Sequence, residues 1–341
     1  KLSPKLDTFL TIKGYQGPVV FKAVRSIYGL VQSPRRFAQK LTAKLLKMGF
    51  RQTIEDECCF VHPGAKEKEP AHTDHEDIPE EEENPSGPSQ QMVIAGWVDD
   101  LICLSHNQPD NEWLQTTLQE EFTLSPGSGE PVDLFLGMKV ERDRERKLLK
   151  ISSEKAITNL LHSMAAHLPP TKTFATPLSP EAKLDKPTGS PTETTELDDD
   201  MPPMDRIREG ETLITEDVFP YRRVVGSALH LSRTCRPDIA LAVSELSRHL
   251  GTTTERHVKA AKRLLLYLRK TPDLGIIWHG KVSTLSALRL EPYSDSDWAG
   301  NSANRKSRSG NTIQLHNATI DWMTKLQSVQ SLSSCEAETI S

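Results

Sequence analysis

The sequence predicts an α+β protein, because three kinds of segment alternate along it. Residues 34–48 repeat apolar side chains at helical spacing, whereas residues 92–104 consist of two short apolar runs separated by two aspartates. Two acidic segments, 63–90 and 178–217, are rich in Pro, Glu and Asp. Such segments bury too little apolar surface to fold alone, so we expect them to be disordered linkers.

The elements before the second acidic segment follow from local signals. Ser33 is a candidate N-cap for the helix 34–48, and Gly49 is a candidate stop. The segment 92–104 predicts a strand, a tight turn and a second strand. A helix is expected over about 111–122. A second hairpin is expected over about 134–152.

Three successive helices are expected after the second acidic segment, over residues 221–233, 237–250 and 255–269. Pro237 suits the first turn of the middle helix. From about residue 275 the pattern is strand-like. It ends at SSCEAETIS, which is typical of a capped helix start at Ser333 or Ser334.

The charge of the chain has to be mapped before it is interpreted. The 341 residues carry a formal charge of −5, which argues against a nucleic-acid binder. However, the two acidic segments together hold 21 acidic and 6 basic residues, so the remainder carries +10. The parts expected to fold are therefore compatible with an acidic polymer as partner. Solubilising linkers are an equally good explanation.

The composition excludes two other classes of protein. No apolar run approaches the roughly 18 residues of a membrane span. Five cysteines without CxxC pairs favour a reducing, intracellular setting over a disulfide scaffold or a zinc ribbon. No signal peptide is visible, so secretion is not expected.

The strongest chemical signal is the pair Asp99 and Asp100 at the predicted turn of an apolar hairpin. Carboxylates are costly in apolar surroundings unless they are solvated or bound to cations. Mg²⁺ prefers hard oxygen ligands and bridges carboxylates to phosphates, so a magnesium site for phosphoryl transfer is one interpretation. An ordinary Asp-containing turn is the other.

Several motifs resemble, in order, those of copia-type LTR retrotransposon Pol polyproteins. GWVDDL resembles the YxDD signature of reverse transcriptases, with Trp97 in place of Tyr, and SIYGLVQSPRRF at 26–37 resembles the motif that precedes it. Further blocks are FLGMKVER, ATPL, YRRVVGSALHLSRTCRPDIALAVSELSRHL and HVKAAKRLLLYLRKTPDLGI. YSDSDWAGN, RKSRSG and LSSCEAETIS resemble the start of the ribonuclease H.

The resemblance implies roles for residues of the polymerase part. Asp99 and Asp100 match the metal-binding carboxylates of the palm, with Asp99 preferred as the direct ligand. A second set matches the loop and helix start beside the template and incoming nucleotide: Gly29, Ser33 and Pro34, with Arg35 and Arg36 as possible phosphate contacts. A solvated helix face explains the two arginines equally well.

In the ribonuclease H part, the resemblance implies that Asp295 and Glu338 share the metals. Asp297 and Glu336 are near neighbours that a misalignment would exchange with them. From spacing alone, the two aspartates share one face of a strand and the two glutamates diverge on a helix, so only one of each pair easily meets the same metal.

The implied organisation is a partial reverse transcriptase palm over 1–177, a linker over 178–217, a helical thumb or connection over 218–272, and the N-terminal half of a ribonuclease H-like mixed-sheet domain over 273–341. The implied cofactor is Mg²⁺ at two-metal sites. The implied partners are an RNA template with a DNA primer, or an RNA–DNA hybrid.

Departures from the family pattern lead to the expectation that both centres are incomplete. The upstream palm aspartate and the later ribonuclease H aspartates lie outside these 341 residues, and Val31 stands where Lys is usual. A nucleic-acid-binding module without catalysis, or a non-functional remnant, are therefore alternatives to an enzyme.

Overall fold

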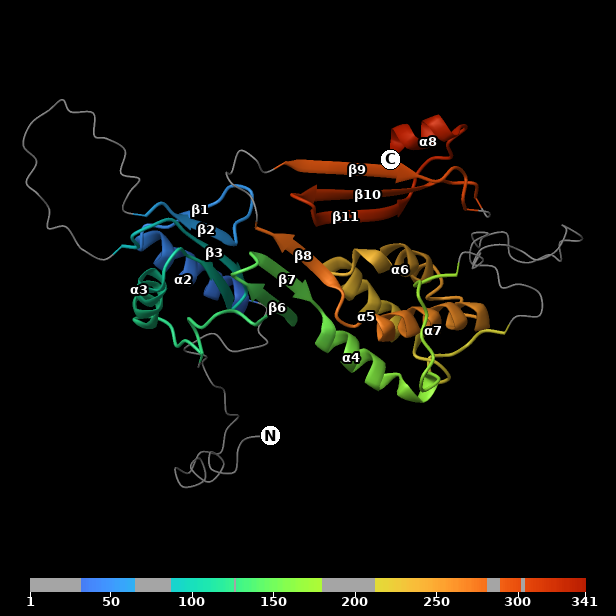
Figure 1. Cartoon of the computed structure of the whole chain (residues 1–341), viewed down its shortest axis with the longest axis horizontal. Coiled ribbons are helices and arrows are strands. Elements are labelled where there is room, and N and C mark those ends of the chain that lie inside the picture. Colours follow the sequence, from blue (N-terminus) through green and yellow to red (C-terminus); the bar gives the residue numbers. More distant parts are fainter. Residues whose placement is uncertain (1–31, 65–86, 126, 180–211, 281–288, 302–303) are drawn as a thin grey trace, which may run out of the picture. The chain divides into compact units, whose positions relative to one another are not determined.

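The computed structural model describes residues 32–64, 87–125, 127–179, 212–280, 289–301 and 304–341. The chain divides into two compact units, unit 1 (residues 1–131) and unit 2 (residues 132–341), and each combines helices with antiparallel strands (Figure 1). The predicted α+β class is confirmed. Gly29 and most of both acidic segments lie outside the described residues.

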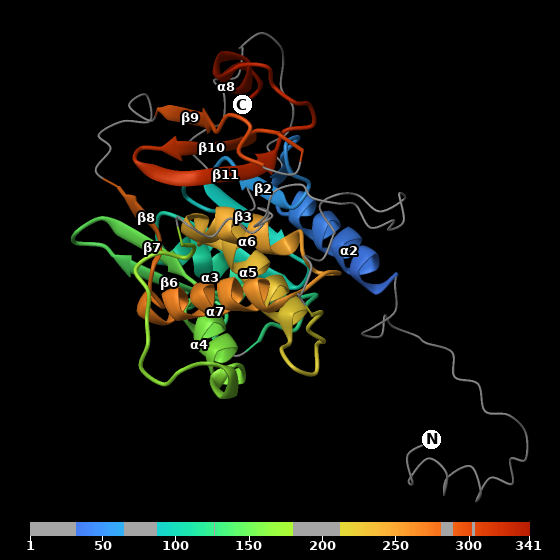
Figure 2. The same ribbon diagram turned by 90° about the vertical axis from the view of Figure 1, so that its right-hand side faces the viewer.

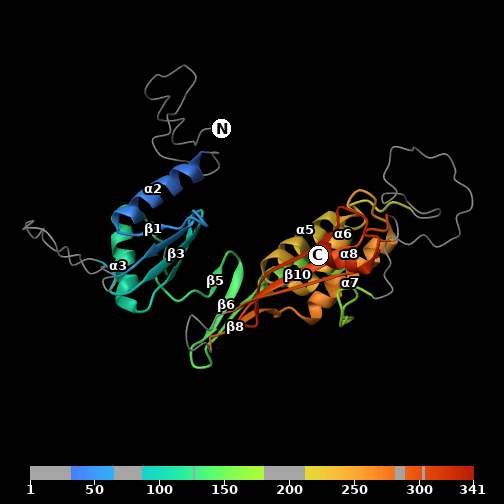
Figure 3. The same cartoon turned by 90° about the horizontal axis from the view of Figure 1, so that it is seen from above.

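Unit 1 is a four-stranded antiparallel sheet with two helices packed on one face (Figure 3). The strands follow the order β1 (Arg51–Gln52), β2 (Cys59–His62), β3 (Met92–Trp97) and β4 (Asp100–Leu104). The helices are α2 (Ser33–Lys47) and α3 (Gln108–Gln119). Leu45 of α2, Ile94 of β3 and Leu118 of α3 meet in the core, which forms because the apolar side chains of each element lie on one face.

The predicted helix near residue 34 is confirmed, but its predicted cap is wrong. Ser33 is already helical and Gln32 is the N-cap residue, without a side-chain cap. This start places Pro34 in the first turn, where the missing N–H of proline loses no intrahelical hydrogen bond. Gly49 ends the helix with a φ of +91°, a conformation that glycine adopts without steric cost.

The helix α3 begins three residues before the predicted start, because a cap lies further upstream. The side chain of Asn107 accepts a hydrogen bond from the Asp110 N–H at 2.8 Å. Asp110 in turn accepts one from the Ser89 N–H at 2.8 Å. Ser89 belongs to the segment expected to be a disordered linker, so the end of that segment is ordered against α3.

Unit 2 contains two sheets and a group of helices. The first sheet has the order β5 (Leu134–Phe135), β6 (Met138–Asp143), β7 (Leu148–Ser152) and β8 (Gly275–His279). The second has the order β11 (Ala318–Leu326), β10 (Arg308–Leu315) and β9 (Leu290–Ser296). The helices are α4 (Glu154–Ser163), α5 (Tyr221–Thr234), α6 (Ala240–Ser247), α7 (Glu255–Lys270) and α8 (Ser334–Ile340), with short 3₁₀ turns η2 (Ala165–His167) and η4 (Pro237–Ile239).

The helices α4 to α7 share one apolar core, which includes Ile157, Val224, Leu246 and Leu264. The predicted helix 237–250 is divided: residues 237–239 form η4, and α6 begins at Ala240. The helix α4 was not predicted. None of the helices in the described residues is both long and apolar enough to cross a membrane.

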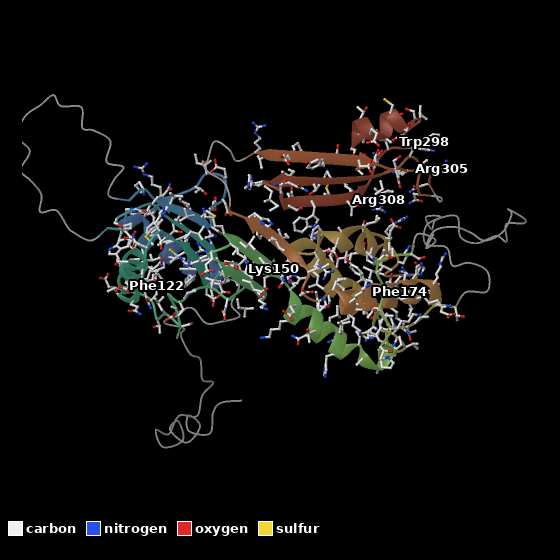
Figure 4. The ribbon with its side chains drawn as sticks, in the orientation of Figure 1. Phe122, Lys150, Phe174, Trp298, Arg305 and Arg308 are labelled. Atoms are coloured by element: carbon white, nitrogen blue, oxygen red, sulfur yellow. The ribbon has the colours of Figure 1, made fainter. Side chains whose placement is uncertain are left out.

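The sheet β9–β11 lies between α8 on one face and the helices α5 and α6 on the other (Figures 1 and 2). On the first face, the Gln327 side chain donates to the Ala337 carbonyl of α8 at 2.8 Å. On the second face, the Trp322 indole N–H donates to the Ser232 carbonyl of α5 at 2.6 Å. Arg308, labelled in Figure 4, forms an ion pair with Glu245 of α6.

A buried arginine joins the ends of α5 and α7. Arg236 is 0% exposed and donates two hydrogen bonds to the Asp238 carboxylate, at 2.9 and 2.7 Å. It also donates to the carbonyl and the hydroxyl of Thr271, each at 2.9 Å. The Tyr267 hydroxyl donates to Asp238 at 2.7 Å. Every arm of the guanidinium is thus satisfied, as a buried charge requires.

The same contacts change the titration of Asp238. Burial alone would raise the pKa of this carboxyl group, but the hydrogen bonds and the charge of Arg236 outweigh burial and hold the pKa below its usual value. A carboxyl group with a lowered pKa stabilises the folded state above its unfolded pKa of about 3.9. That contribution is lost as the pH falls through the folded-state pKa.

Replacing Arg236 by Met should destabilise unit 2 by about 3–5 kcal/mol, because Asp238 would keep its charge without its cationic partner. The free energy of unfolding of the full chain in urea measures the effect. Lys259→Met is the matched control. The side chains of Lys259 and its ion-pair partner Glu255 are each 73% exposed. A loss below about 0.5 kcal/mol in the free energy of unfolding is therefore expected. Equal losses for the two variants would contradict this role of Arg236.

Candidate functional site

The first candidate centre is the tip of the β3–β4 hairpin. The last cross-strand pair joins Trp97 to Asp100, so Val98 and Asp99 form a two-residue turn. Asp99 lies in the turn and Asp100 is the first residue of β4. Both carboxylates are exposed. The predicted strand–turn–strand is confirmed, and it presents two adjacent acidic side chains to solvent.

The backbone at this tip is strained. Val98 has a φ of +57°, although a β-branched side chain rarely adopts the left-handed region. A two-residue hairpin turn with positive φ at its first position has the pattern of a type II′ turn, where glycine is usual. Pairing of the strands on both sides holds the turn. Such strain is found where the surrounding structure fixes a residue for function.

The two faces of this sheet differ in burial. Met92 and Ile94 are fully buried against the helices, whereas Val93, Ala95 and Ile102 on the opposite face are only half-buried. Trp97 precedes the turn and is 62% exposed. The tip therefore carries an exposed indole beside the two carboxylates.

Cys103 lies on β4, three residues after Asp100, and is the thiol nearest to the pair in sequence. Burial, with a smaller contribution from the charge of Asp110, raises its pKa to about 11. The sulfur is therefore protonated at neutral pH, which removes it as a nucleophile.

The residues expected on the template side lie at the start of α2. Ser33 is half-buried, whereas Pro34, Arg35 and Arg36 are exposed in the first turn. Gly29 lies outside the described residues. The two arginines are thus accessible to a ligand. The same exposure is found on a solvated helix face, so exposure alone does not separate the two interpretations.

The second candidate centre joins β9 to α8 in unit 2. The Glu338 carboxylate accepts a hydrogen bond from the Ser296 N–H at 3.3 Å, one residue after Asp295. The Ser341 hydroxyl donates to the Asp295 carbonyl at 2.8 Å. These contacts join α8 to the backbone of β9 at Asp295 and Ser296.

The alternative carboxylates, Asp297 and Glu336, also accept hydrogen bonds from the backbone. Asp297 lies beyond β9, which ends at Ser296, so the expected strand face shared with Asp295 is not formed. Its carboxylate accepts a hydrogen bond from the Arg308 N–H at 2.6 Å. Glu336 accepts one from the Leu332 N–H at 2.7 Å, as part of the cap of α8. Glu338 likewise accepts a backbone hydrogen bond, so these contacts alone do not distinguish it from Glu336.

Open space lies beside Asp295. Gly310 of β10 is its direct cross-strand partner, and a Cβ atom built there would meet no atom within 4 Å. Side chains of cross-strand partners stand next to each other on the same face, so the glycine leaves room beside the carboxylate.

Each centre offers two hard oxygen ligands, which suits Mg²⁺. Among the described residues, no group of three or more His, Cys, Asp or Glu side chains forms a metal site. His72 and His75, which are spaced as HxxH in the first acidic segment, lie outside the described residues.

One further aromatic side chain lies near the second centre. Trp298 follows β9 and is 55% exposed. Its indole N–H donates to the Ser331 carbonyl at 3.3 Å, so the ring is held at the surface (Figure 4). Because Trp298 lies after the end of β9, strand alternation gives no information about its burial.

Comparison with known proteins shows similarity along almost the whole chain. "Retrovirus-related Pol polyprotein from transposon RE1" of Arabidopsis thaliana is 31% identical over 325 residues, which cover 94% of this chain and 18% of that protein. "Retrovirus-related Pol polyprotein from transposon TNT 1-94" of Nicotiana tabacum is 28% identical over 94% of this chain and 21% of that protein. The chain thus spans about a fifth of the length of these relatives.

A shorter relative is matched over most of its own length. "Secreted RxLR effector protein 161" of Plasmopara viticola is 36% identical over 119 residues, which are 35% of this chain and 81% of that protein. No protein-family model and no solved structure matches the chain.

Replacing Val98 by Gly should stabilise the hairpin by about 0.5–1 kcal/mol, because glycine adopts a positive φ without steric cost. Amide hydrogen exchange of β3 and β4 in the full chain measures the change. Val93→Gly, within β3, is the control and should speed exchange, since glycine weakens a strand. Faster exchange in Val98→Gly as well would contradict the assignment of strain to this turn.

Proposed function

The chain belongs to the Pol polyproteins of copia-type retrotransposons, and from this we propose that it supplies parts of an RNA-directed DNA polymerase and of a ribonuclease H. The substrates would be an RNA template with a DNA primer, and an RNA–DNA hybrid.

The observation that carries the polymerase assignment is the geometry of Asp99 and Asp100. Both carboxylates are exposed at a strained two-residue turn, and a sheet backed by two helices fixes the turn. A catalytic metal site needs ligands of this kind, held rigidly while open to the substrate. Mg²⁺ bound there would activate the primer 3′-hydroxyl and stabilise the leaving pyrophosphate.

The protein groups around this centre would bind and orient the nucleic acid. Arg35 and Arg36 are exposed in the first turn of α2 and would contact phosphates, which are the main protein contacts along a nucleic-acid backbone. Ser33, Pro34 and, from the sequence, Gly29 would line the template side. The +10 charge outside the acidic segments favours such a partner.

The ribonuclease H assignment rests on Asp295 and Glu338. The contact of Glu338 with the Ser296 N–H ties α8 to the end of β9, and the open space at Gly310 gives the substrate access beside Asp295. These two carboxylates would hold the metals that hydrolyse the RNA strand. Because each centre has only two carboxylates among the described residues, we expect ligands from elsewhere to complete both.

A nucleic-acid-binding module without catalysis is the second candidate. It is favoured by the charge of +10 outside the two acidic segments, which suits an acidic polymer whether or not catalysis occurs. Such a module needs the exposed basic residues but not the carboxylates.

Mn²⁺ binding tests the first centre, because Mn²⁺ accepts the same oxygen ligands as Mg²⁺ and is detected by water-proton relaxation. Asp99→Asn and Asp100→Asn should each weaken Mn²⁺ binding to the full chain by about tenfold, since each removes a charged ligand. Asp133→Asn, an exposed carboxylate outside both centres, is the control and should change nothing. Equal affinities in all three variants would refute a metal site at this hairpin.

Nucleic-acid binding and primer extension separate the two candidates. The chain should bind an RNA–DNA hybrid with an affinity that falls steeply between 50 and 200 mM salt. An enzyme part should bind more tightly with Mg²⁺, and Asp99→Asn should remove that gain. If Mg²⁺ does not tighten binding of the hybrid to the unmodified chain, the nucleic-acid-binding module is favoured. Primer extension by the chain alone, abolished by Asp99→Asn, would show that our expectation of an incomplete centre is wrong.

A further inference from the structure

Two arginines of α7 bind the segment 169–177, which forms neither helix nor strand. Arg269 donates a hydrogen bond to the Pro169 carbonyl at 2.6 Å. Arg263 donates one from its Nη2 atom to the hydroxyl oxygen of Thr176 at 2.7 Å. The segment is therefore attached to α7 at its start and near its end.

The guanidinium of Arg263 is only partly satisfied. Its Cζ atom lies 4.2 Å from the centroid of the Phe174 ring, a residue labelled in Figure 4. Nη2 binds Thr176, whereas Nε is buried and has no hydrogen-bond partner. Among the residues that the structure describes, no acidic side chain pairs with this arginine. A buried donor without an acceptor is costly, so this position favours a further anionic group.

The vacant atom belongs to a pair of donors that suits an oxoanion. Nε and Nη2 point from the same edge of the planar guanidinium and can each donate to one of two neighbouring oxygens. The chain already uses this pair at Arg236, where Nε and Nη2 donate to the two oxygens of Asp238 at 2.9 and 2.7 Å. At Arg263 a single hydroxyl oxygen stands where two oxygens would fit, and Nε is left without an acceptor.

The hydroxyl of Thr176 is accessible to a modifying enzyme. The residue is exposed and lies outside helices and strands, where enzymes that act on a protein chain reach it most readily. Pro177 follows it, and a proline disfavours the helical conformation of the residue before it. The hydroxyl donates to the Leu178 carbonyl at 2.9 Å. Because Thr176 is exposed, water can replace this contact when the hydroxyl hydrogen is lost.

We propose that Thr176 is a phosphorylation site whose phosphate binds the Nε and Nη2 atoms of Arg263. A protein kinase would transfer the γ-phosphoryl group of ATP to the threonine oxygen. The new P–O bond forms as the bond between the γ-phosphorus and the bridging oxygen breaks, ADP leaves, and the hydroxyl proton passes to solvent. The phosphate carries a charge of about −1.5 to −2 and three acceptor oxygens, which neutralise the guanidinium and fill both donors. The site shares no residue with the proposed metal centres.

Treatment of the full chain with MgATP and a proline-directed protein kinase, followed by phosphopeptide mass spectrometry, tests the modification. Thr176 should carry phosphate. Thr271 is an internal control because it also precedes a proline, whereas its hydroxyl accepts from Arg236 and donates to the Tyr267 carbonyl. It should stay unmodified. No phosphate on Thr176, or equal modification of both threonines, would overturn the proposal.

Thermal unfolding of the treated chain tests the role of Arg263. Phosphate on Thr176 should raise the midpoint of unfolding of unit 2 by about 3–6 °C over that of the untreated chain, because it satisfies both donors. Thr176→Val should gain nothing from the same treatment, which separates this phosphate from any added elsewhere. Arg263→Gln should remove most of the gain. Arg305→Gln, an exposed arginine of unit 2 labelled in Figure 4, is the control and should retain it.

The same measurement distinguishes a phosphate site from a merely structural contact. If Arg263 only attaches the segment 169–177 to α7, phosphorylation of Thr176 replaces a neutral contact without filling a vacant donor. The midpoint should then stay unchanged or fall. Either result, or a gain that Arg263→Gln leaves intact, would refute the binding of the phosphate by Arg263.

Discussion

The architecture of unit 2 depends on the burial of one charge. Arg236 has no exposed surface, and the partners of its guanidinium come from η4 and from the C-terminal end of α7. A guanidinium in such a place is tolerated only if all its donors are satisfied, so the positions of Asp238, Tyr267 and Thr271 are tightly restricted. The helix ends meet at that point, and the start of β8 follows α7 directly. The Trp322 and Arg308 contacts then place the sheet β9–β11 on helices whose ends are already fixed.

Both candidate metal centres lie at the ends of secondary-structure elements, where short turns or caps position the carboxylates, and not in deep pockets. At Asp99 a two-residue turn between paired strands fixes the carboxylate, and at Glu338 a capped helix places it beside the end of a strand. Of the four carboxylates near the second centre, Asp297 and Glu336 are bound to backbone N–H groups. Glu338 also accepts a backbone hydrogen bond, from the Ser296 N–H. Three of the four carboxylates therefore help to hold the backbone of this region in place.

The sequence predicted the α+β class, the helices α2, α5 and α7 and both hairpins, because their apolar side chains repeat at the spacing of one face. It missed α4, although Ile157, Leu160 and Leu161 of this ten-residue helix follow helical spacing, so the signal was present in the sequence. It assigned the cap of α2 to Ser33, although the helix continues one residue further to place Pro34 in its first turn. The pair Asp99 and Asp100 was evident from its apolar surroundings. The distinction between Glu336 and Glu338 was not, since it depends on which side chain the cap of α8 uses.

The pairing of β7 with β8 joins residues more than 120 positions apart, from Ser152 with Gly275 to Leu148 with His279. During synthesis, β7 therefore has an unpaired edge until α4 to α7 and the acidic segment between them have been made. Pairing over such a separation is slow, and an open strand edge can pair with another chain in the meantime. Lys150 lies in the middle of β7, and a charged side chain there makes that edge less prone to pairing with another chain. Because α4 to α7 lie between β7 and β8 in the sequence, they are synthesised before β8. The pairing of β7 with β8 is therefore a late step, after these helices have formed their core.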